Sequence, residues 1–389
     1  MLARDSGRPT RLLLNDRVLF RRPTGVGHYA RQLLDALRAE GDGLDVHAFL
    51  SDRLPAPRAP RDLRPPMSLD EWKRREARQR LAGALRPLAE APYRLAFRLS
   101  ARRCDVYHEP NHIPICCRAP TVTTIHDLSV LLHPEWHPAS RVRWFEREFA
   151  RGLAQTRRFL AVSEHTRREM VQHLGLSPAR IDVTYQAPRS AFAPQPPASA
   201  RETCRQLGLP ARFFLYAGTL EPRKNVALAL EAFAALPPGL REEMPLVLAG
   251  APGWRMESLP AALSRLGIHS QTRLLGYVPD RVLASLYSAC TALVWPSLYE
   301  GFGLPPLEAM ACGTAIIASS ATSLPEVVAD AGLLLDPHDA PAWSDAMRRM
   351  AEDDEWRARW CERGLRRAAA FSWRRCARET IACYRAAVA

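Results

Sequence analysis

Five consecutive residues have the letters of a zinc-peptidase helix. The stretch HEPNH, residues 108–112, matches H-E-x-x-H, in which two histidines one helical turn apart bind Zn²⁺ and the glutamate activates water. That chemistry needs His108 and His112 on one helix face. Pro110 lies between them, and proline is tolerated only in the first turn of a helix and favours extended backbone before it. We therefore expect the end of a strand running into a loop, and no metal site.

A pair of glycines forms a second pattern with chemical meaning. Gly25 and Gly27 stand in G-x-G-x-x-A, the letters of the dinucleotide-binding fingerprint. In that fingerprint the first glycine follows its strand directly, whereas here ten residues separate Gly25 from the apolar run that ends at Leu14. The glycines still precede a helical pattern, so backbone could approach a ligand closely there. The pattern indicates a loop beside phosphate or sugar, or an ordinary connection, and gives little support for NAD.

Arg223 and Lys224 form a cation pair after the apolar run that ends at Gly218. Ligands of parallel α/β folds bind at the carboxyl ends of the strands. Arginine holds phosphate with two parallel hydrogen bonds, and lysine supplies a compact charge. The alternative is a solvated turn on which Glu221 pairs with Arg223. Because the chain has only one other lysine, Lys73, the pattern favours a phosphate site.

The most specific pattern is YEGFGLPPLEAMACGT, in which Glu300 and Glu308 are eight residues apart. Pro305 and Pro306 favour the opening turn of a helix, and Gly313 favours its end. This predicts a helix that carries Glu308, with Glu300 on the loop before it. Loop amides and a helix N-terminus attract anions, while carboxylates accept hydrogen bonds from hydroxyl groups. The combination indicates a sugar-nucleotide pocket; the alternative is a glycine-rich loop with two solvent-facing glutamates.

Short apolar runs alternate with amphipathic stretches along the chain, which predicts parallel sheets covered by helices on both faces. The fold class is therefore α/β, with two doubly wound domains in series: an N-terminal domain over residues 1–188 and a C-terminal domain over residues 189–371. A final helix over residues 372–389 packs back on the N-terminal domain or on the C-terminal one. A proline-dense linker covers residues 186–200. Predicted strands include 11–14, 45–50, 105–109, 121–127, 213–217, 245–249, 272–277, 292–296, 315–319 and 332–335, and predicted helices include 28–38, 140–153 and 164–174.

The amino-acid composition limits the kinds of molecule that the protein is expected to bind. The net charge is +13 in 389 residues, and almost all of the positive charge is arginine. A basic chain can meet nucleic acid, an anionic membrane or a phosphorylated small molecule, but no nucleic-acid-binding motif is present. Nine cysteines without a C-x-x-C pair favour reduced thiols and a cytoplasmic location. The basic stretch from Lys73 to Arg103, predicted as two helices broken near Pro87 and Pro92, is expected to lie against an anionic membrane surface, or to pack as an ordinary amphipathic pair.

These motifs together resemble the retaining family 4 glycosyltransferases. The resemblance rests on the E-x7-E stretch with its flanks ALVWPSLY and AMACGTAIIAS, on GTLEPRKN, and on GVGHYARQLL and TTIHDLSVLLHPEW in the N-terminal half. It runs from about residue 11 to the C-terminus. It implies the GT-B fold, in which two Rossmann-like domains face each other across a cleft and the donor lies mainly on the C-terminal one.

The resemblance also implies roles for individual residues. Arg223 and Lys224 would hold the donor diphosphate, and Glu308 would bind the ribose. Glu300 would contact hydroxyls of the transferred sugar and His126 would lie beside it, which makes these two the candidate catalytic residues. The nucleobase would lie near Tyr277 and Val278. The implied donor-binding set is Gly25, Gly27, Gly218, Arg223, Lys224, Phe302, Gly303, Leu304 and Glu308.

The implied activity is transfer of a hexose, specifically mannose from GDP-mannose, onto a glycan or lipid-linked oligosaccharide in polysaccharide biosynthesis. The donor would be a GDP- or UDP-sugar, the reaction would retain anomeric configuration, and no metal cofactor would be needed. The protein would be cytoplasmic and peripheral at the inner face of the cell membrane, without a nucleic-acid partner. The alternatives are a sugar-nucleotide epimerase of GT-B architecture and a non-catalytic nucleotide-sugar-binding protein. An NAD oxidoreductase is a more distant alternative.

Overall fold

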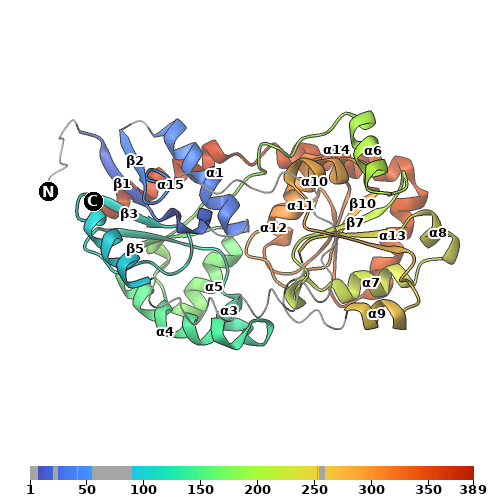
Figure 1. The fold of residues 1–389 in the computed structure, drawn as a ribbon, viewed down its shortest axis with the longest axis horizontal. Helices are drawn as coiled ribbons and strands as arrows, with labels where there is room; N and C mark the ends of the chain where they lie inside the picture. The colour runs from blue at the N-terminus through green and yellow to red at the C-terminus, as the bar shows by residue number, and fades with distance from the viewer. Residues whose placement is uncertain (1–7, 21–24, 42, 55–89, 252, 254–258) are drawn as a thin grey trace.

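The computed structural model describes residues 8–20, 25–41, 43–54, 90–251, 253 and 259–389. Figure 1 shows two lobes, each built from a sheet with helices packed around it. All strand pairs in both sheets are parallel. The predicted α/β class with two doubly wound domains is confirmed.

The first sheet has the strand order β2-β1-β3-β4-β5-β6. Its strands are β1 (Thr10–Leu14), β2 (Leu44–Ala48), β3 (Val106–Glu109), β4 (Thr121–Ile125), β5 (Thr156–Ala161) and β6 (Ile181–Val183). The helices of this half are α1 (Gly25–Glu40), α3 (Ser129–Leu132), α4 (Ala139–Gln155) and α5 (Glu164–Leu174).

The second sheet has the order β12-β11-β10-β7-β8-β9. Its strands are β7 (Phe214–Ala217), β8 (Leu246–Ala249), β9 (Thr272–Gly276), β10 (Ala292–Trp295), β11 (Ile316–Ser319) and β12 (Leu333–Leu335). Its helices are α6 (Pro197–Gln206), α7 (Val226–Ala234), α8 (Pro238–Glu243), α9 (Leu259–Arg265), α10 (Asp280–Ala289), α11 (Leu304–Ala311), α12 (Leu324–Val328), α13 (Ala340–Glu352) and α14 (Asp354–Ala368).

Each sheet has one point where the strand order reverses. In the second sheet this switch point lies between β7 and β10, and in the first it lies between β1 and β3. Loops that leave neighbouring strands at a switch point run to opposite faces of the sheet and leave a crevice at the carboxyl ends, where ligands of such folds bind. The loops after β7 and β10 are those that carry Lys224 and Glu300.

The last helix, α15 (Trp373–Val388), returns to the first sheet. It lies beside α1, in the same lobe as β1 and β3 (Figure 1). Its residues Cys376, Ile381 and Tyr384 share a buried cluster with Leu12 of β1 and Tyr29 of α1. The chain therefore crosses between the two halves twice.

Several boundaries differ from the sequence-based prediction. Strand β2 ends at Ala48 rather than residue 50, because the Asp16 carboxylate accepts the N–H groups of Leu50 and Ser51 at 2.7 and 2.6 Å and turns the chain there. The predicted linker 186–200 is shorter, because Pro197 opens α6, where a proline without an N–H is well tolerated. Residues 90–101 are helical and include Pro92, whereas the predicted break near Pro87 lies outside the described residues.

The zinc-peptidase letters lie on a strand end and a loop, as predicted. Glu109 is the last residue of β3, and His112 has a left-handed backbone with φ of 60°. The His108 ring lies between Tyr384 Oη at 2.6 Å and Thr124 Oγ1 at 2.8 Å, so it joins α15 to the sheet. Among the described residues no group of three or more His, Cys, Asp or Glu side chains is arranged to hold a metal ion.

Candidate active site

Lys224 and Glu300 form a buried ion pair at the switch point of the second sheet. Their side chains leave the loops after β7 and β10 and meet with Nζ 2.5 Å from Oε1, while Trp295 Nε1 donates to the same oxygen at 3.1 Å. Lys224 is 9% exposed and Glu300 is 5% exposed. Burial, together with the neighbouring Arg223, lowers the pKa of Lys224. The two residues predicted to serve the donor are therefore in direct contact.

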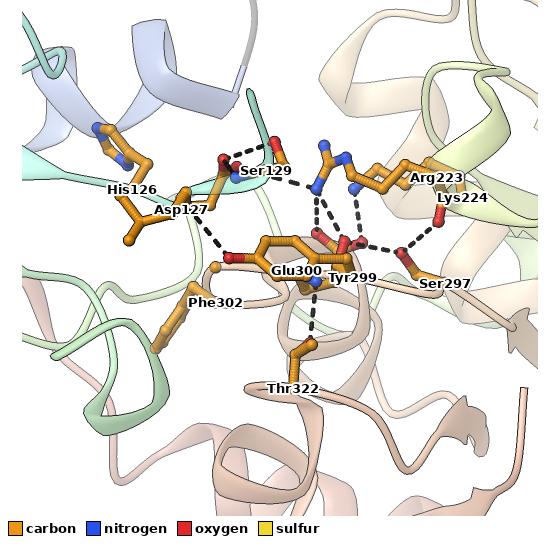
Figure 2. A network of polar contacts seen from close by, with 12 residues as sticks. His126, Asp127, Ser129, Arg223, Lys224, Ser297, Tyr299, Glu300, Phe302 and Thr322 are labelled. Atoms are coloured by element: carbon orange, nitrogen blue, oxygen red, sulfur yellow. Dashed lines mark hydrogen bonds and ion pairs between the residues drawn. The ribbon is translucent and has the colours of Figure 1, made fainter. Parts of the chain in front are cut away.

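Arg223 joins the same network and links it to the N-terminal domain (Figure 2). Its Nε and Nη2 donate to Glu221 Oε1 at 3.1 and 2.9 Å, and its Nη1 donates to the Tyr299 carbonyl at 2.9 Å. Nη1 also lies 3.5 Å from Glu300 Oε2 and 3.9 Å from Asp127 Oδ2, which follows β4. The Glu221–Arg223 pair thus exists, but it is largely buried among further carboxylates and does not lie on a solvated turn. Two cations and three carboxylates meet at this point.

Backbone amides complete a possible anion site beside the ion pair. Ser323 Oγ lies 2.9 Å from the carbonyl oxygens of both Glu300 and Phe302 and donates its one hydroxyl hydrogen between them, which fixes the loop before α11. Gly303 has φ of 111°, and a Cβ there would lie 2.7 Å from Leu324, so a glycine is needed for this turn. In the part of the chain that the structure describes, the N–H groups of Phe302, Gly303 and Leu304 have no hydrogen-bond partner in the protein. Amides at a helix N-terminus attract anions.

Glu308 lies on α11, as predicted, but its carboxylate already has a partner. Arg189 donates from Nε to Oε1 at 2.7 Å and from Nη2 to Oε2 at 2.9 Å. Arg189 also donates to Asp280 and to His28 of α1. Burial raises the pKa of Glu308, although Arg189 opposes that shift.

His126 follows β4 and its ring is held in place. Burial, and then the nearby His112, lowers the pKa of His126 to about 3, so the ring is neutral at physiological pH. A neutral ring with Nε2 2.8 Å from the Pro110 carbonyl donates that hydrogen bond, and Tyr29 packs edge-on against the ring at 4.8 Å. This ring orientation favours a positioning role over proton transfer.

The two domains touch at the His126 carbonyl. Gly301, one residue after Glu300, packs so closely that a Cβ built on it would lie 1.6 Å from that oxygen. Thr166 Oγ1 at the start of α5 donates to the Gly301 carbonyl at 3.2 Å. On the other side of the contact, the Leu128 N–H donates to Tyr299 Oη at 3.2 Å. The candidate catalytic residues of the two domains are thus adjacent.

The glycines predicted to approach the donor have different surroundings. Gly25 is the exposed first residue of α1, and a Cβ there would meet nothing within 4 Å. Gly27 is buried within the same helix. Gly218 packs against the indole of Trp295, which a Cβ would meet at 2.6 Å, so its small size serves packing.

Comparisons with known proteins agree with this geometry. Residues 23–187 match the family model described as Glycosyltransferase Family 4, and residues 204–367 match Glycosyl transferases group 1. The O-antigen chain mannosyltransferase B of Escherichia coli is 40% identical over 295 residues, which cover 76% of this chain and 77% of that protein. The chain belongs to the family 4 glycosyltransferases.

Other relatives of this family 4 glycosyltransferase are longer. The serotype-specific mannosyltransferase WbdA of Escherichia coli is 32% identical over 262 residues, or 65% of this chain, but this match spans only 32% of WbdA. The D-inositol 3-phosphate glycosyltransferase of Nocardioides is 35% identical over 238 residues, which cover 57% of this chain and 51% of that enzyme.

Solved structures confirm the GT-B fold of this glycosyltransferase. Anabaena Alr3699/HepE, solved with UDP and glucose, superposes with a TM-score of 0.71 and 19% identity over 96% of this chain and 99% of that one. WaaG, a glycosyltransferase involved in lipopolysaccharide biosynthesis, gives a TM-score of 0.68 and 16% identity over 95% and 98%. At these identities the likeness concerns the fold alone.

Several residues in the site of this family 4 glycosyltransferase were not predicted from the sequence. Arg189 was assigned to the linker, although it is the only charged residue between residues 186 and 200, which is a signal that could have found it. Asp127, Trp295 and Tyr299 lie in stretches that carry the family resemblance, but their contacts with the predicted residues depend on the fold.

Proposed function

We propose that the chain transfers a hexose, and in particular mannose, from a GDP- or UDP-sugar to a hydroxyl of a glycan or lipid-linked oligosaccharide. The observation that carries the proposal is the meeting of Arg223, Lys224 and Glu300 beside the unpartnered amides before α11, at the switch point of the second sheet. Two relatives named as mannosyltransferases support mannose, and a neighbour solved with UDP-glucose supports a nucleotide-sugar donor.

The residues suggest how the reaction would proceed. The bond between the anomeric carbon and the diphosphate oxygen breaks, and the acceptor oxygen forms a bond to that carbon on the same face. Arg223, Lys224 and the amides of residues 302–304 would stabilise the negative charge that develops on the departing diphosphate. The acceptor proton would pass to a diphosphate oxygen, while Glu300 would hold hydroxyls of the transferred sugar. We propose that these fixed cations make a metal cofactor unnecessary.

We expect the two cations to have different partners before and after the donor binds. Lys224 and Arg223 each have a carboxylate partner in the structure. A diphosphate that enters would take over part of this contact, and Glu300 would exchange Lys224 for sugar hydroxyls. Binding of the donor would therefore prepare Glu300 for its role.

Nucleotide binding provides the first test. We expect GDP or UDP to raise the melting temperature of the protein, because a ligand that binds only the native state at about 100 times its Kd adds about 2.7 kcal/mol of stability. The increase should persist in EDTA, and NAD should produce none. Stabilisation by NAD alone would overturn the proposal. Mannose transfer to an acceptor, followed by mass spectrometry, then separates a transferase from an epimerase, which forms product without acceptor, and from a protein that only binds.

We also propose that the helical residues 90–101 face an anionic membrane. Leu95 and Leu99 are 59% and 51% exposed one turn apart, arginines 98, 102 and 103 are exposed beside them, and Phe97 is buried on the opposite face. An apolar stripe flanked by cations is typical of interfacial helices. No helix in the described part of the chain has the length and apolar character needed to span a bilayer. Residues 73–89 of the predicted basic stretch lie outside the described residues.

Flotation with vesicles of 30% phosphatidylglycerol in phosphatidylcholine, a composition on the order of an anionic bacterial surface, tests this face. We expect Leu95→Ser/Leu99→Ser to reduce the bound fraction severalfold, because each leucine loses about 2 kcal/mol of apolar burial. Leu274→Ser is the control, since Leu274 is 41% exposed on β9 of the other domain. Equal loss in both variants, or binding that is insensitive to phosphatidylglycerol, would contradict a specific membrane face.

A further inference from the structure

One buried ion pair lies where the donor ribose is proposed to bind. Both carboxylate oxygens of Glu308 accept a hydrogen bond from the guanidinium of Arg189, at 2.7 and 2.9 Å. Glu308 is 2% exposed and the Arg189 side chain is 11% exposed. Parallel hydrogen bonds from one guanidinium fix the plane of a carboxylate as well as its distance.

Arg189 itself is fixed from several elements. Its Nη1 donates to Asp280 Oδ1 at 2.7 Å at the start of α10, and to His28 Nε2 at 3.1 Å in the first turn of α1. Its guanidinium lies 4.4 Å above the Phe192 ring. Burial, and then Arg189, lowers the pKa of His28 to about 4, so that ring is neutral and accepts this bond. The orientation of Glu308 is therefore determined jointly by α1, α10 and the segment between the domains.

The pair does not prevent Glu308 from accepting further hydrogen bonds. An ionised carboxylate has about four lone-pair sites, and Arg189 uses one on each oxygen. One site on each oxygen remains, which matches the two adjacent hydroxyls of a ribose. Without Arg189, a carboxylate this buried would lack a counter-charge, and protonation would turn one of its acceptor oxygens into a donor.

We propose that Arg189 is a positioning residue of the donor site, which orients the Glu308 carboxylate so that it accepts both hydroxyls of the donor ribose. This inference rests on the proposed function, because it presumes that a nucleoside diphosphate binds here. Arg189, which lies in the segment between the domains, is thereby added to the donor site. Its two parallel hydrogen bonds to Glu308 are the reason why this residue is an arginine. A lysine would supply the charge, but its rotatable ammonium would not fix the plane of the carboxylate with two parallel hydrogen bonds.

A simpler role would be purely mechanical. Arg189 touches both domains and could serve only to hold them together. That role predicts equal effects on every ligand, whereas a role in ribose recognition predicts an effect confined to ligands that carry the ribose hydroxyls. A 2′,3′-dideoxynucleotide, which lacks both hydroxyls, therefore separates the two roles.

The experiment compares GDP with 2′,3′-dideoxy-GDP, and UDP with 2′,3′-dideoxy-UDP, by titration calorimetry on wild type, Arg189→Met, Arg189→Lys and Arg205→Met. Arg205 is the matched control, because it makes the same two-bond contact with Glu202 but its side chain is 76% exposed. For Arg189→Met we expect a fall of about 10- to 100-fold in affinity for the ribonucleotide, the range for hydrogen bonds to a charged group. Affinity for the 2′,3′-dideoxynucleotide should change less than about threefold, because it has neither hydroxyl that Glu308 would bind. Arg189→Lys should recover part of the preference for ribose, and Arg205→Met should match wild type.

Steady-state kinetics adds a second readout. The KM for the donor should rise in Arg189→Met while kcat changes little, since ribose contacts are the same in the ground and transition states. Equal loss of ribo- and deoxynucleotide affinity, or a fall in kcat at unchanged KM, would overturn the proposal and leave Arg189 a mechanical link. Wild-type binding without a preference for ribose would overturn it while the nucleotide site stands. Absence of all nucleotide binding by the wild type would instead refute the proposed function.

Discussion

Replacement of Lys224 with methionine is expected to lower kcat by about 100- to 1,000-fold, the loss seen when one preorganised electrostatic group is removed from a transition state. The reason is its position: Nζ is 2.5 Å from Glu300, next to Arg223, where a departing diphosphate would develop charge. The KM for the donor should change less than kcat, because the interaction strengthens as the bond breaks. Steady-state kinetics with saturating donor measures both.

The same substitution should also destabilise the protein, because it leaves the buried Glu300 carboxylate with only the more distant Arg223, 3.5 Å from Oε2, as its cation. Loss of one partner of a buried pair costs up to about 3–5 kcal/mol. The double variant Lys224→Met/Glu300→Gln removes both charges and keeps an oxygen for Trp295 Nε1, so it should recover most of the melting temperature. It should not recover activity. If the double variant regained turnover, the ion pair would be structural, and wild-type turnover in Lys224→Met would refute the diphosphate role of this lysine.

Gly301→Ala is expected to reduce turnover by at least about 100-fold, because a misplacement of roughly 1 Å is enough for such a loss. The added Cβ would lie 1.6 Å from the His126 carbonyl oxygen and 3.0 Å from Asp127 Cβ. These are not ends of flexible side chains, so the clash can be relieved only if the two domains separate. Gly301 does not have a positive φ, and alanine at this residue puts no strain on the loop itself.

The matched control is Gly239→Ala on α8, where a Cβ would meet nothing within 4 Å. Both variants should retain the circular dichroism of the wild type. In small-angle scattering only Gly301→Ala should show an increased radius of gyration. Wild-type activity together with wild-type scattering for Gly301→Ala would mean that close contact between the domains is not needed for transfer.

Much of the second sheet could be predicted from the sequence, and the physical reason is burial on both faces. Strands such as β7, β8 and β10 are fully buried and therefore appear as continuous apolar runs, so their predicted ends differ from the observed ones by one residue. Lys224 follows the end of β7, and Glu300 follows the end of β10, within seven residues, so both lie on loops at the carboxyl edge of a parallel sheet. That these two loops are neighbours depends on the strand order, which the sequence pattern did not predict.

Other parts of the site depend on contacts that no local pattern encodes. Arg189 reaches Glu308 across 119 positions of the chain, and Tyr299 meets the N–H of Leu128 across 171. The end of β2 was missed for a similar reason, since Asp16 caps a turn 34 residues away while the apolar letters continue through Leu50. Sequence periodicity predicts which face of an element is buried, but it does not say which partner will cover it.

The return of α15 to the first sheet determines the order in which the protein can be completed on the ribosome. Domains generally fold one after another as they emerge, starting from the N-terminus. Here the core around Leu12 and Tyr29 also requires Cys376 and Tyr384, which are synthesised after the whole C-terminal sheet. The N-terminal sheet must wait, with an apolar face uncovered, until the C-terminal domain has been made. Chains that stop before α15 would therefore be expected to expose this face to chaperones and proteases.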